Sequence, residues 1–403
     1  MLSRTFIQEN KHHLTVIAAL LSMVGPFSID AYLTSFPDIE ASFGISRTVL
    51  SQSLAVYLAA FAVSTLLWGP LSDRIGRRLV ILFSLSLYFI ASAGCALSDQ
   101  AGHFMFFRVL QGFSASGGFI ASRAMIRDAH DSSSAHKAMS QVILLFALAP
   151  AIAPVLGAWL HDHLGWRSVF WFLTVFGVLL VVMTVFIEET LAGDQRRPFR
   201  PASVFRVYVS TLMHRQFPAM TLSLSFTFAG AFLYIAGAPS VIYDFLGLGT
   251  DDFGLQFIPM VAGLMSGAYV SSRMAHRLAA ARVVFIGFSI MALGVALNLL
   301  QVSLLEAFVV NVIGPLVVYV FGLAIMMPAV TILALDCFPR NRGAAASMQG
   351  FFQMLVNAGV ASIAVPLLHS RLEYFVLGQL VFLLISLSLW VFAQKTESGC
   401  VLS

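Results

Sequence analysis

Long apolar runs recur along the whole chain, and they limit the possible folds more than any other feature of the sequence. A helix needs roughly 20 apolar residues to cross the hydrocarbon core of a bilayer. Of the 403 residues, 59% are apolar and only 10% are charged, whereas about 25% of the residues in a typical soluble domain are charged. Backbone groups inside a bilayer must be paired within the chain, so continuous apolar runs predict helices and not the short alternating segments of a β-barrel. We therefore predict an all-α polytopic membrane protein.

The apolar runs divide into twelve predicted spans, six on each side of a central polar stretch. They lie near 14–36, 47–69, 79–98, 103–125, 137–160, 165–187, 216–239, 253–275, 281–301, 304–329, 343–367 and 374–394. The expected organisation is a six-helix bundle over 1–190, a cytoplasmic linker over 191–214 with a short surface helix near 205–212, and a second six-helix bundle over 215–403. Two halves of six are typical of secondary transporters built from a repeat.

The basic residues test this arrangement, because cytoplasmic loops are enriched in Lys and Arg. The segments on one side of the predicted spans hold 19 of the 23 Lys and Arg residues. The opposite side holds only Arg47, Arg167 and Arg371. This asymmetry predicts a multi-pass protein of the inner (cytoplasmic) membrane with both termini in the cytoplasm. The three cysteines are scattered without metal-ligand spacing, and no disulfide is expected.

A dense polar island, Trp68–Arg78, separates the second and third apolar runs, and we expect it to form a loop at the membrane surface. Asp73 can accept hydrogen bonds from a helix N-terminus or from an arginine, and the two glycines permit close helix approach and a tight turn. If Asp73 contacts the start of a helix in the second half, the island acts as a conformational gate. Alternatively, its arginines only anchor the loop at the surface. The gate candidates are Gly69, Asp73, Arg74, Gly76, Arg77 and Arg78.

Two charges, Asp30 and Arg108, lie well inside predicted spans. A charge at the centre of a spanning helix costs roughly 2.5–3.5 kcal/mol on insertion scales and marks function by default. The rise of about 1.5 Å per residue places both at a depth of about 10 Å, where they could pair. The leading hypothesis is that Asp30 carries a transported proton, with Arg108 favouring its ionised form and burial favouring its neutral form. A structural ion pair and simple cavity lining are the alternatives.

Polar and aromatic side chains within the spans are candidates for contact with a ligand. Gln349, Gln353 and Asn357 recur every four residues and form a polar stripe on one helix face. Such a stripe either lines a wet cavity or forms hydrogen bonds between helices. An aromatic and Met-rich wall in the second half would suit bulky, weakly polar ligands. The remaining cavity candidates are Tyr32, Tyr57, Gln111, Gln141 and Phe232.

Pro150 and Pro154, together with Gly157, predict a hinge in the fifth span, although adjustment of helix packing would also explain them. The segment His161-Asp162-His163 offers too few ligands for a metal site, and none is predicted. No cofactor is expected, because the sequence contains no nucleotide-binding or hydrolase motif. No nucleic-acid partner is expected either.

With these features in place, the island residues Gly69–Arg78 resemble the G-x-L-x-D-x-x-G-R-R/K signature of the major facilitator superfamily, at the expected position between spans 2 and 3. Further segments are similar to drug-resistance transporters of the Bcr/CflA type within that superfamily. They are Ser28–Leu33 with Phe36-Pro37, Arg108–Gly112, Ile126–Asp128, Met139-Ser140, Ala149–Gly157, Gly165–Arg167 and Glu188–Leu191. The resemblance covers residues 14–191 best, and its prolines in span 5 follow alanine where the family pattern has glycine.

The resemblance implies a major-facilitator fold and a secondary active transporter, not an enzyme. It implies export of small amphipathic compounds such as drugs in exchange for protons by alternating access, with the lipid bilayer, protons and a small-molecule substrate as partners, and a monomeric state. The alternative is a proton-coupled transporter of an endogenous metabolite, such as a siderophore or an amino-acid or sugar derivative, in either direction. A membrane enzyme or non-transporting receptor is a different class that the absence of a catalytic constellation disfavours.

Overall fold

A computed structural model covers the chain and describes residues 11–130, 132–196, 201–275, 277–305, 307–339 and 341–398. Throughout these ranges the regular secondary structure is helical, and no strand occurs among the described residues. The chain forms two compact units, Met1–Val204 and Phe205–Ser403. The predicted all-α fold is confirmed.

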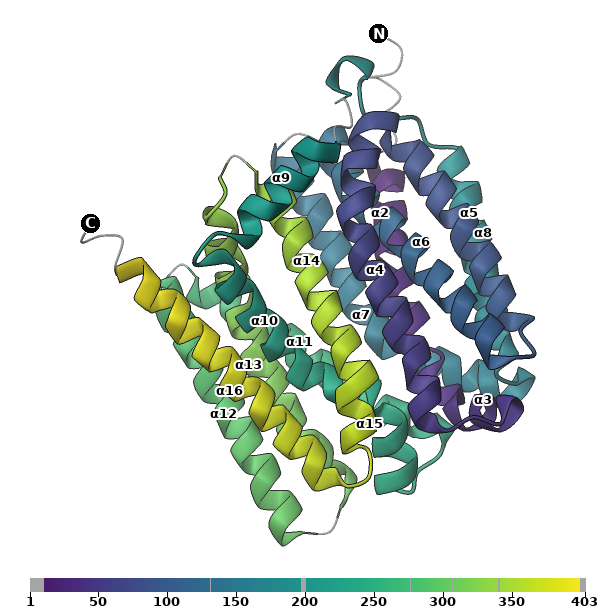
Figure 1. Ribbon diagram of the computed structural model, residues 1–403, viewed down its shortest axis with the longest axis vertical. Coiled ribbons are helices and arrows are strands. Elements are labelled where there is room, and N and C mark those ends of the chain that lie inside the picture. Colours follow the sequence, from purple (N-terminus) through teal and green to yellow (C-terminus); the bar gives the residue numbers. More distant parts are fainter. Residues whose placement is uncertain are drawn as a thin grey trace. The chain divides into compact units, whose positions relative to one another are not determined.

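In the first unit, the helix α6 lies between α4 and α5, while α2 packs against α6 and α7, and α8 packs against α5 (Figure 1). The elements are α2 (Lys11–Asp30), η1 (Leu33–Ser35), α3 (Phe36–Phe43), α4 (Arg47–Ile75), α5 (Arg77–Ala96), α6 (Ala101–Ala129), α7 (Ser132–Leu164), α8 (Arg167–Val185) and η2 (Gly193–Gln195). The helix α9 (Pro201–Leu212) follows in the central polar stretch, where a short surface helix is predicted.

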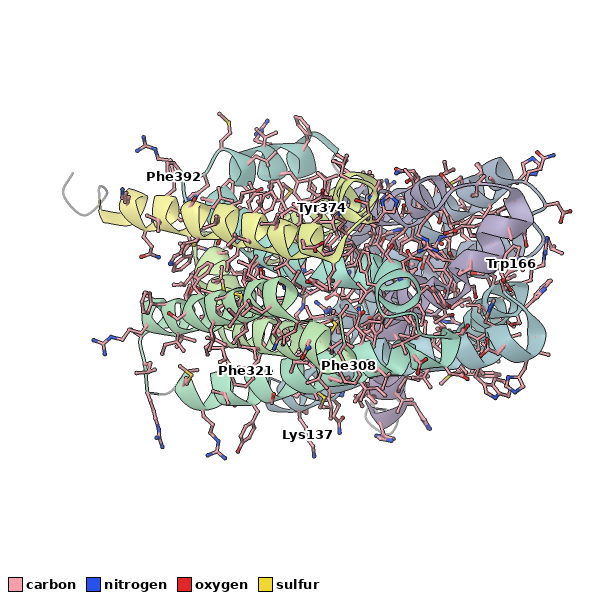
Figure 2. The ribbon with its side chains drawn as sticks, turned by 90° about the horizontal axis from the view of Figure 1, so that it is seen from below. Lys137, Trp166, Phe308, Phe321, Tyr374 and Phe392 are labelled. Atoms are coloured by element: carbon pink, nitrogen blue, oxygen red, sulfur yellow. The ribbon has the colours of Figure 1, made fainter. Side chains whose placement is uncertain are left out.

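In the second unit, α13 packs against α11 and α12, while α10 packs against α13, α14 and α16. The elements are α10 (Phe217–Ala236), η3 (Ser240–Phe245), η4 (Thr250–Asp252), α11 (Phe253–Met274), α12 (Ala280–Leu304), α13 (Val309–Asp336), α14 (Arg342–Gly359), η5 (Val360–Ala364), α15 (Val365–Leu368) and α16 (Leu372–Ser398). Large apolar side chains such as Phe392 on α16, 59% exposed, lie at the outer surface, as lipid-facing residues do (Figure 2).

Eleven helical stretches within the described ranges are long and apolar enough to cross a membrane. They correspond to the predicted spans with one exception, the span near 103–125. There the structure has α6, a helix of 29 residues. Its glycines, serines and Arg108 lower its apolarity, but the helix is long enough to serve as the twelfth span.

In each unit, the first helix that is long and apolar enough to cross a membrane is interrupted after 20 residues. The helix α2 ends at Asp30, and the chain passes through η1 before α3 begins with Pro37 in its first turn. The helix α10 ends at Ala236, and Pro239 precedes the π-helix η3. Pro239 has no N–H to donate to the preceding turn, which accounts for the break after α10, whereas Pro37 lies seven residues beyond the end of α2 and does not account for the break at Asp30.

The polar island is not the predicted loop. The helix α4 continues through Pro70 and Asp73 to Ile75, and α5 begins at Arg77. The one residue between the helices is Gly76, whose φ of 111° is a conformation that other residues rarely adopt. The prediction of a loop was wrong because a helix that leaves the apolar core remains helical wherever its backbone bonds can still form.

Candidate functional site

Arg108 is the centre of a polar network inside the first unit, and its side chain is completely buried. Its Nη1 donates to the backbone oxygen of Ser28 at 3.1 Å and to Oε1 of Gln111 at 2.5 Å. Gln111 in turn donates to Oγ of Ser92 at 2.8 Å. Since Ser28 lies in the last turn of α2, the guanidinium supplies a donor and a positive charge to the carbonyl end of an interrupted helix.

Two tyrosine rings enclose the Arg108 guanidinium. The guanidinium carbon lies 4.4 Å from the ring centroid of Tyr32 and 4.5 Å from that of Tyr57. Both rings are fully buried, and the Tyr32 hydroxyl lies 3.2 Å from Oγ of Ser53. Both tyrosines, predicted as cavity residues, therefore contact Arg108, and the cation–π contacts help to hold a charge in an apolar bundle.

One edge of the Arg108 guanidinium is free. Its Nε and Nη2 atoms are buried without a hydrogen-bond partner, and so is the hydroxyl of Tyr57. Leaving a buried polar group without a partner costs about 1–3 kcal/mol, and more when the group is charged. The Nε and Nη2 groups of an arginine form the fork that binds a carboxylate through two parallel hydrogen bonds. This edge can therefore donate to a carboxylate or to another acceptor.

Asp30 is the last residue of α2, with 4% of its surface exposed. It forms no hydrogen bond or ion pair with Arg108, which instead binds Ser28 and Gln111. A negative charge at the carbonyl end of a helix is disfavoured by the helix dipole. The structure thus separates the two buried charges that the sequence suggested as a pair, and the carboxyl group and the guanidinium edge are both left without a partner of opposite charge.

The predicted hinge residues lie in α7, beside the break in the first span. The helix α7 is continuous through Pro150 and Pro154. A Cβ atom on Gly157 would lie 2.0 Å from the backbone oxygen of Ala31, in the break between α2 and η1. Only glycine permits this approach, so α7 and the interrupted helix meet backbone to backbone.

The gate candidates form a cluster around Arg77, whose side chain is nearly buried. Its Nη1 donates to Oδ1 of Asp73 and to Oγ of Ser72, at 2.5 and 2.7 Å, and its Nε donates to Oδ2 of Asp128 at 2.9 Å. Asp128 comes from the last turn of α6, so Arg77 joins three helices. Gly69 lies within α4, and Arg74 projects from its last turn as an exposed side chain.

Two charged side chains, Glu189 and Arg78, join the start of α5 to the end of α8, and each binds backbone groups of the other segment. The Glu189 carboxylate accepts the backbone N–H groups of Arg77 and Arg78, at 2.9 and 3.2 Å, and a Cβ on Gly76 would lie 2.1 Å from it. In the opposite direction, Arg78 donates to the backbone oxygen of Val185 at 2.7 Å, at the last turn of α8. Each charge meets the helix end that favours it.

The second unit contains a buried polar cluster without any charge, which the sequence did not single out. Gln256 donates to the backbone oxygen of Tyr234 at 2.8 Å, and Asn298 donates to the Tyr234 hydroxyl at 2.8 Å. Asn298 also donates to Gln379 at 3.3 Å. The Oε1 of Gln256 and the Oδ1 of Asn298 are buried without a partner. These polar residues stand alone in apolar spans, and that isolation is the one sequence signal that could have indicated them.

The remaining cavity candidates are dispersed. Gln349 donates to Thr331 on α13 at 3.2 Å, which is the interhelical alternative for that residue. Asn357 is buried, whereas Gln353 is half-buried. Phe232 is buried against Phe228, and Gln141 is exposed on α7. The polar stripe of α14 is therefore only partly accessible.

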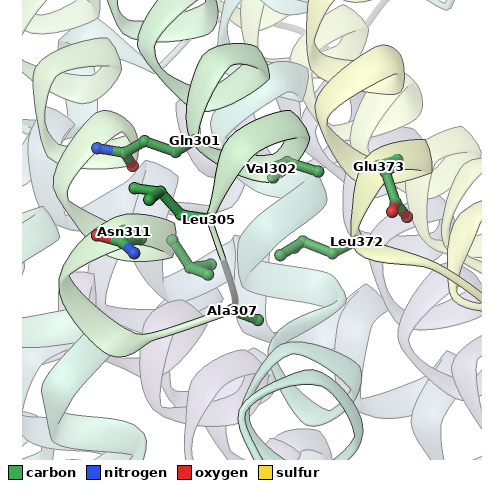
Figure 3. A pocket seen from close by; sticks show the side chains of 8 residues that line it. Gln301, Val302, Leu305, Ala307, Asn311, Leu372 and Glu373 are labelled. Carbon is green, nitrogen blue, oxygen red and sulfur yellow. The ribbon is translucent and has the colours of Figure 1, made fainter.

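A small pocket of about 130 Å³ opens in the second unit, between the end of α12, the start of α13 and the start of α16 (Figure 3). Gln301, Asn311 and Glu373 supply its polar groups, and leucine, valine and alanine side chains supply the rest. At this size it fits a few waters and not a drug-sized ligand, whose pockets occupy roughly 300–1,000 Å³. We assign no substrate to it.

The segment His161-Asp162-His163 ends α7, where Nε2 of His161 lies 3.4 Å from Oδ2 of Asp38. His163 contacts the backbone oxygen of Trp159 and stacks on its ring. Within the described part of the chain, no group of three or more His, Cys, Asp or Glu residues could hold a metal ion.

Comparison with known proteins matches residues 18–366 to the family model of the Major Facilitator Superfamily. An uncharacterized MFS-type transporter of Bacillus subtilis, YdgK, is 28% identical over 92% of this chain and 94% of its own length. A bicyclomycin resistance protein homolog of Haemophilus influenzae is 26% identical over 85% of this chain and 86% of its own length. The predicted resemblance to drug-resistance transporters is thereby confirmed.

Solved structures show the same fold at low identity. A D-xylose-proton symporter superposes with a TM-score of 0.72 at 18% identity, over 94% of this chain and 97% of the symporter. A bacterial homolog of the human lysosomal transporter Spinster, inward-facing and occupied, gives 0.74 at 14% identity, over 98% of both chains. The family model covers most of the chain, and both sequence and structural relatives are transporters, so this multi-pass membrane protein belongs to the Major Facilitator Superfamily.

Proposed function

We propose that this protein is a secondary active transporter that exports small amphipathic compounds, including drugs, in exchange for protons by alternating access. The names of its relatives support the substrate class. They include the bicyclomycin resistance homolog, a chloramphenicol resistance protein of Acinetobacter baumannii that is 31% identical over 66% of this chain, and multidrug resistance proteins of Escherichia coli.

The observation that supports proton coupling is the presence of two buried ionisable groups in the first unit, Asp30 and Arg108, that do not pair with each other. Asp30 is 4% exposed and forms no ion pair with Arg108, whose Nε and Nη2 atoms are buried without a hydrogen-bond partner. In the proposed cycle, protonated Asp30 stands apart from Arg108, as in this structure. When the proton leaves, the carboxylate gains from pairing with the free edge, because a buried charge that has no partner is strongly disfavoured.

The break after α2 could couple the ionisation of Asp30 to a movement of α7. Asp30 lies at the end of α2, and the following Ala31 carbonyl touches Gly157 of α7. We propose that pairing of Asp30 with Arg108 shifts the break and that α7, with Pro150 and Pro154, moves with it as the hinge. The Asp73–Arg77–Asp128 cluster serves as the conformational gate, with the Asp73 side chain 43% exposed and free to gain a second partner.

The remaining proposals concern the setting of the protein. We propose an inner-membrane location with both termini cytoplasmic, because the basic residues gather on one side of the spans. We propose a monomer organised as two six-helix domains, 1–190 and 215–403, joined by a cytoplasmic linker over 191–214. Its α9 would lie at the membrane surface.

The test is transport into proteoliposomes under an imposed pH gradient, with a panel of antibiotics and, separately, siderophores and amino-acid and sugar derivatives. The proposal expects uptake of amphipathic drugs that requires the gradient and stops with a protonophore. Uptake restricted to the metabolite set would replace the substrate class, and the absence of gradient-linked flux of any compound would overturn transport itself.

A further inference from the structure

Arg123 is a second arginine of α6, and it is separate from the network around Arg108. Its guanidinium carbon lies 4.2 Å from the ring centroid of Phe119, one turn earlier in the same helix. Arg123 is exposed, and Phe119 is half-buried. A basic side chain near the end of a spanning helix commonly extends towards that end to reach water. Arg123 instead folds back from the nearby end of α6, at Ala129, towards the middle of the helix.

The Phe119 ring, which faces this guanidinium, also belongs to an aromatic cluster from three helices. Phe119 lies 6.1 Å, between ring centroids, from both Phe61 on α4 and Phe146 on α7. The rings are tilted or edge-to-face to one another, an arrangement that can receive a further aromatic ring on an exposed face. Because Phe119 and Phe146 are only half-buried, one side of this cluster is accessible.

Among the residues that the structure describes, no acid forms an ion pair with Arg123. The nearest acidic residue on α6, Asp128, binds Arg77, and Arg127 is its other basic neighbour, at 3.9 Å. An accessible guanidinium that stacks on an aromatic ring can still donate from its planar fork, which suits a carboxylate or sulfonate group.

The cluster also leads to the proposed coupling site. Phe61 lies 6.3 Å from Tyr57, whose ring faces the Arg108 guanidinium at 4.5 Å. Arg123, Phe119, Phe61, Tyr57 and Arg108 thus form one line of rings with an arginine at each end. A ligand seated at the Arg123 end would contact side chains that continue to the buried pair.

We propose that Arg123, Phe119 and Phe146 form a binding subsite for aromatic anions, in which the ligand ring stacks on the phenylalanines and its anionic group binds Arg123. This inference rests on the proposed transport function and names a substrate class for it: fused or single aromatic rings that carry a carboxylate or sulfonate.

The test uses two permanently charged probes with similar two-ring skeletons, 2-naphthalenesulfonate and N-methylquinolinium, and measures equilibrium binding to the purified protein and gradient-driven flux in proteoliposomes. Arg123→Gln should weaken naphthalenesulfonate binding at least about tenfold while changing N-methylquinolinium binding less than about twofold, since only the anion uses the charge. Arg123→Lys should retain most of the anion binding. Arg127→Gln is the matched control, because it removes a basic side chain one turn away, 69% exposed, and should leave both probes unaffected.

Equal loss of both probes in Arg123→Gln, or equal loss in Arg127→Gln, would overturn the subsite in favour of a general charge effect. Wild-type protein that binds the cation but not the anion would also overturn it. Binding needs no proton gradient, so naphthalenesulfonate binding without any gradient-linked flux would retain the subsite and overturn the proposed function. Gradient-linked drug flux without any binding of naphthalenesulfonate would retain the proposed function and overturn the subsite.

Discussion

In both units, a buried side chain donates a hydrogen bond near the carbonyl end of the first spanning helix, but the donor is charged in one unit and neutral in the other. In each unit a buried side chain donates to the backbone oxygen two residues before the end of an interrupted helix of 20 residues. In the first unit the donor is Arg108, and Asp30 ends the helix. In the second unit the donor is Gln256, a neutral residue in a neutral cluster.

This difference distinguishes the binding of a free helix carbonyl from the supply of a buried charge. A neutral donor satisfies the orphan carbonyl of an interrupted helix as well as a charged one does. The charge of Arg108 therefore has another purpose, and its free edge together with the unpaired Asp30 supplies one. We propose that the first unit contains the coupling chemistry, while the polar cluster of the second unit holds its helix in place.

The largest effect is expected when the charged donor of the first unit, Arg108, is removed. Arg108→Gln should reduce gradient-driven transport about 10- to 100-fold, because hydrogen bonds to a charged group are worth roughly 1.5–3 kcal/mol and each 1.4 kcal/mol is a factor of ten. Arg108→Lys should recover only part of the rate, since lysine has no fork for a carboxylate. Initial rates in proteoliposomes measure both. Normal gradient-driven rates in Arg108→Gln would show that the charge is dispensable.

Close backbone contacts give the next largest effect. Gly157→Ala places a Cβ against the oxygen of Ala31, and Gly267→Ala places one 2.4 Å from the oxygen of Phe321 in the second unit. Overpacking of this kind costs roughly 1–3 kcal/mol, so both variants should melt earlier in detergent. Only Gly157→Ala should also reduce transport in the protein that remains folded, because its contact lies at the interrupted helix beside Asp30.

Gly350→Ala is the control, since a Cβ there meets nothing within 4 Å. A wild-type melting temperature in Gly157→Ala would contradict the close contact. A matching transport loss in folded Gly267→Ala would remove the distinction between the units.

Removal of the neutral donor should cost less. Gln256→Leu leaves the Tyr234 carbonyl without a partner, which should destabilise the second unit by about 1–2 kcal/mol. The pH dependence of transport should remain that of the wild type, because no charge is lost. Thermal unfolding and a pH series in proteoliposomes test the two halves of this expectation. A shifted pH profile would mean that coupling extends into the second unit.

The smallest effect is expected where Glu189, just after α8, binds the backbone N–H groups at the start of α5. Glu189→Gln keeps the acceptor but removes the charge at the start of α5, a change worth about 0.3–1 kcal/mol at a helix N-terminus. The difference from wild type in thermal unfolding should shrink in 1 M salt, where charges are screened within about 3 Å. A difference that is independent of salt would point to shape and not to charge.

The spans could be predicted because the bilayer imposes both their length and their apolarity, and the family signature could be recognised from Asp73 and its neighbours. The relation between Asp30 and Arg108 could not. Equal depths for the two charges require a continuous first helix, whereas α2 ends at Asp30 although the nearest downstream proline, Pro37, is seven residues away. Helix continuity here depends on packing against α7, which no local pattern records.

The partners of the gate were hidden for a similar reason. Asp128 and Glu189 are distant from Arg77 in sequence, and only the packing of α6 and α8 around α5 brings them to it. Gln256, Asn298 and Gln379 have no common spacing, so they gave no periodic signal. Residues whose role depends on which helices become neighbours need the fold before they can be interpreted.

The most direct test of the central claim is Asp30→Asn in proteoliposomes, with gradient-driven uptake compared with substrate exchange at equal pH on both sides. Asparagine keeps the size and polarity of the side chain but cannot carry a proton. The account predicts that exchange continues while the pH gradient no longer accelerates uptake. Uptake by Asp30→Asn that still rises with the imposed gradient, as in the wild type, would contradict it.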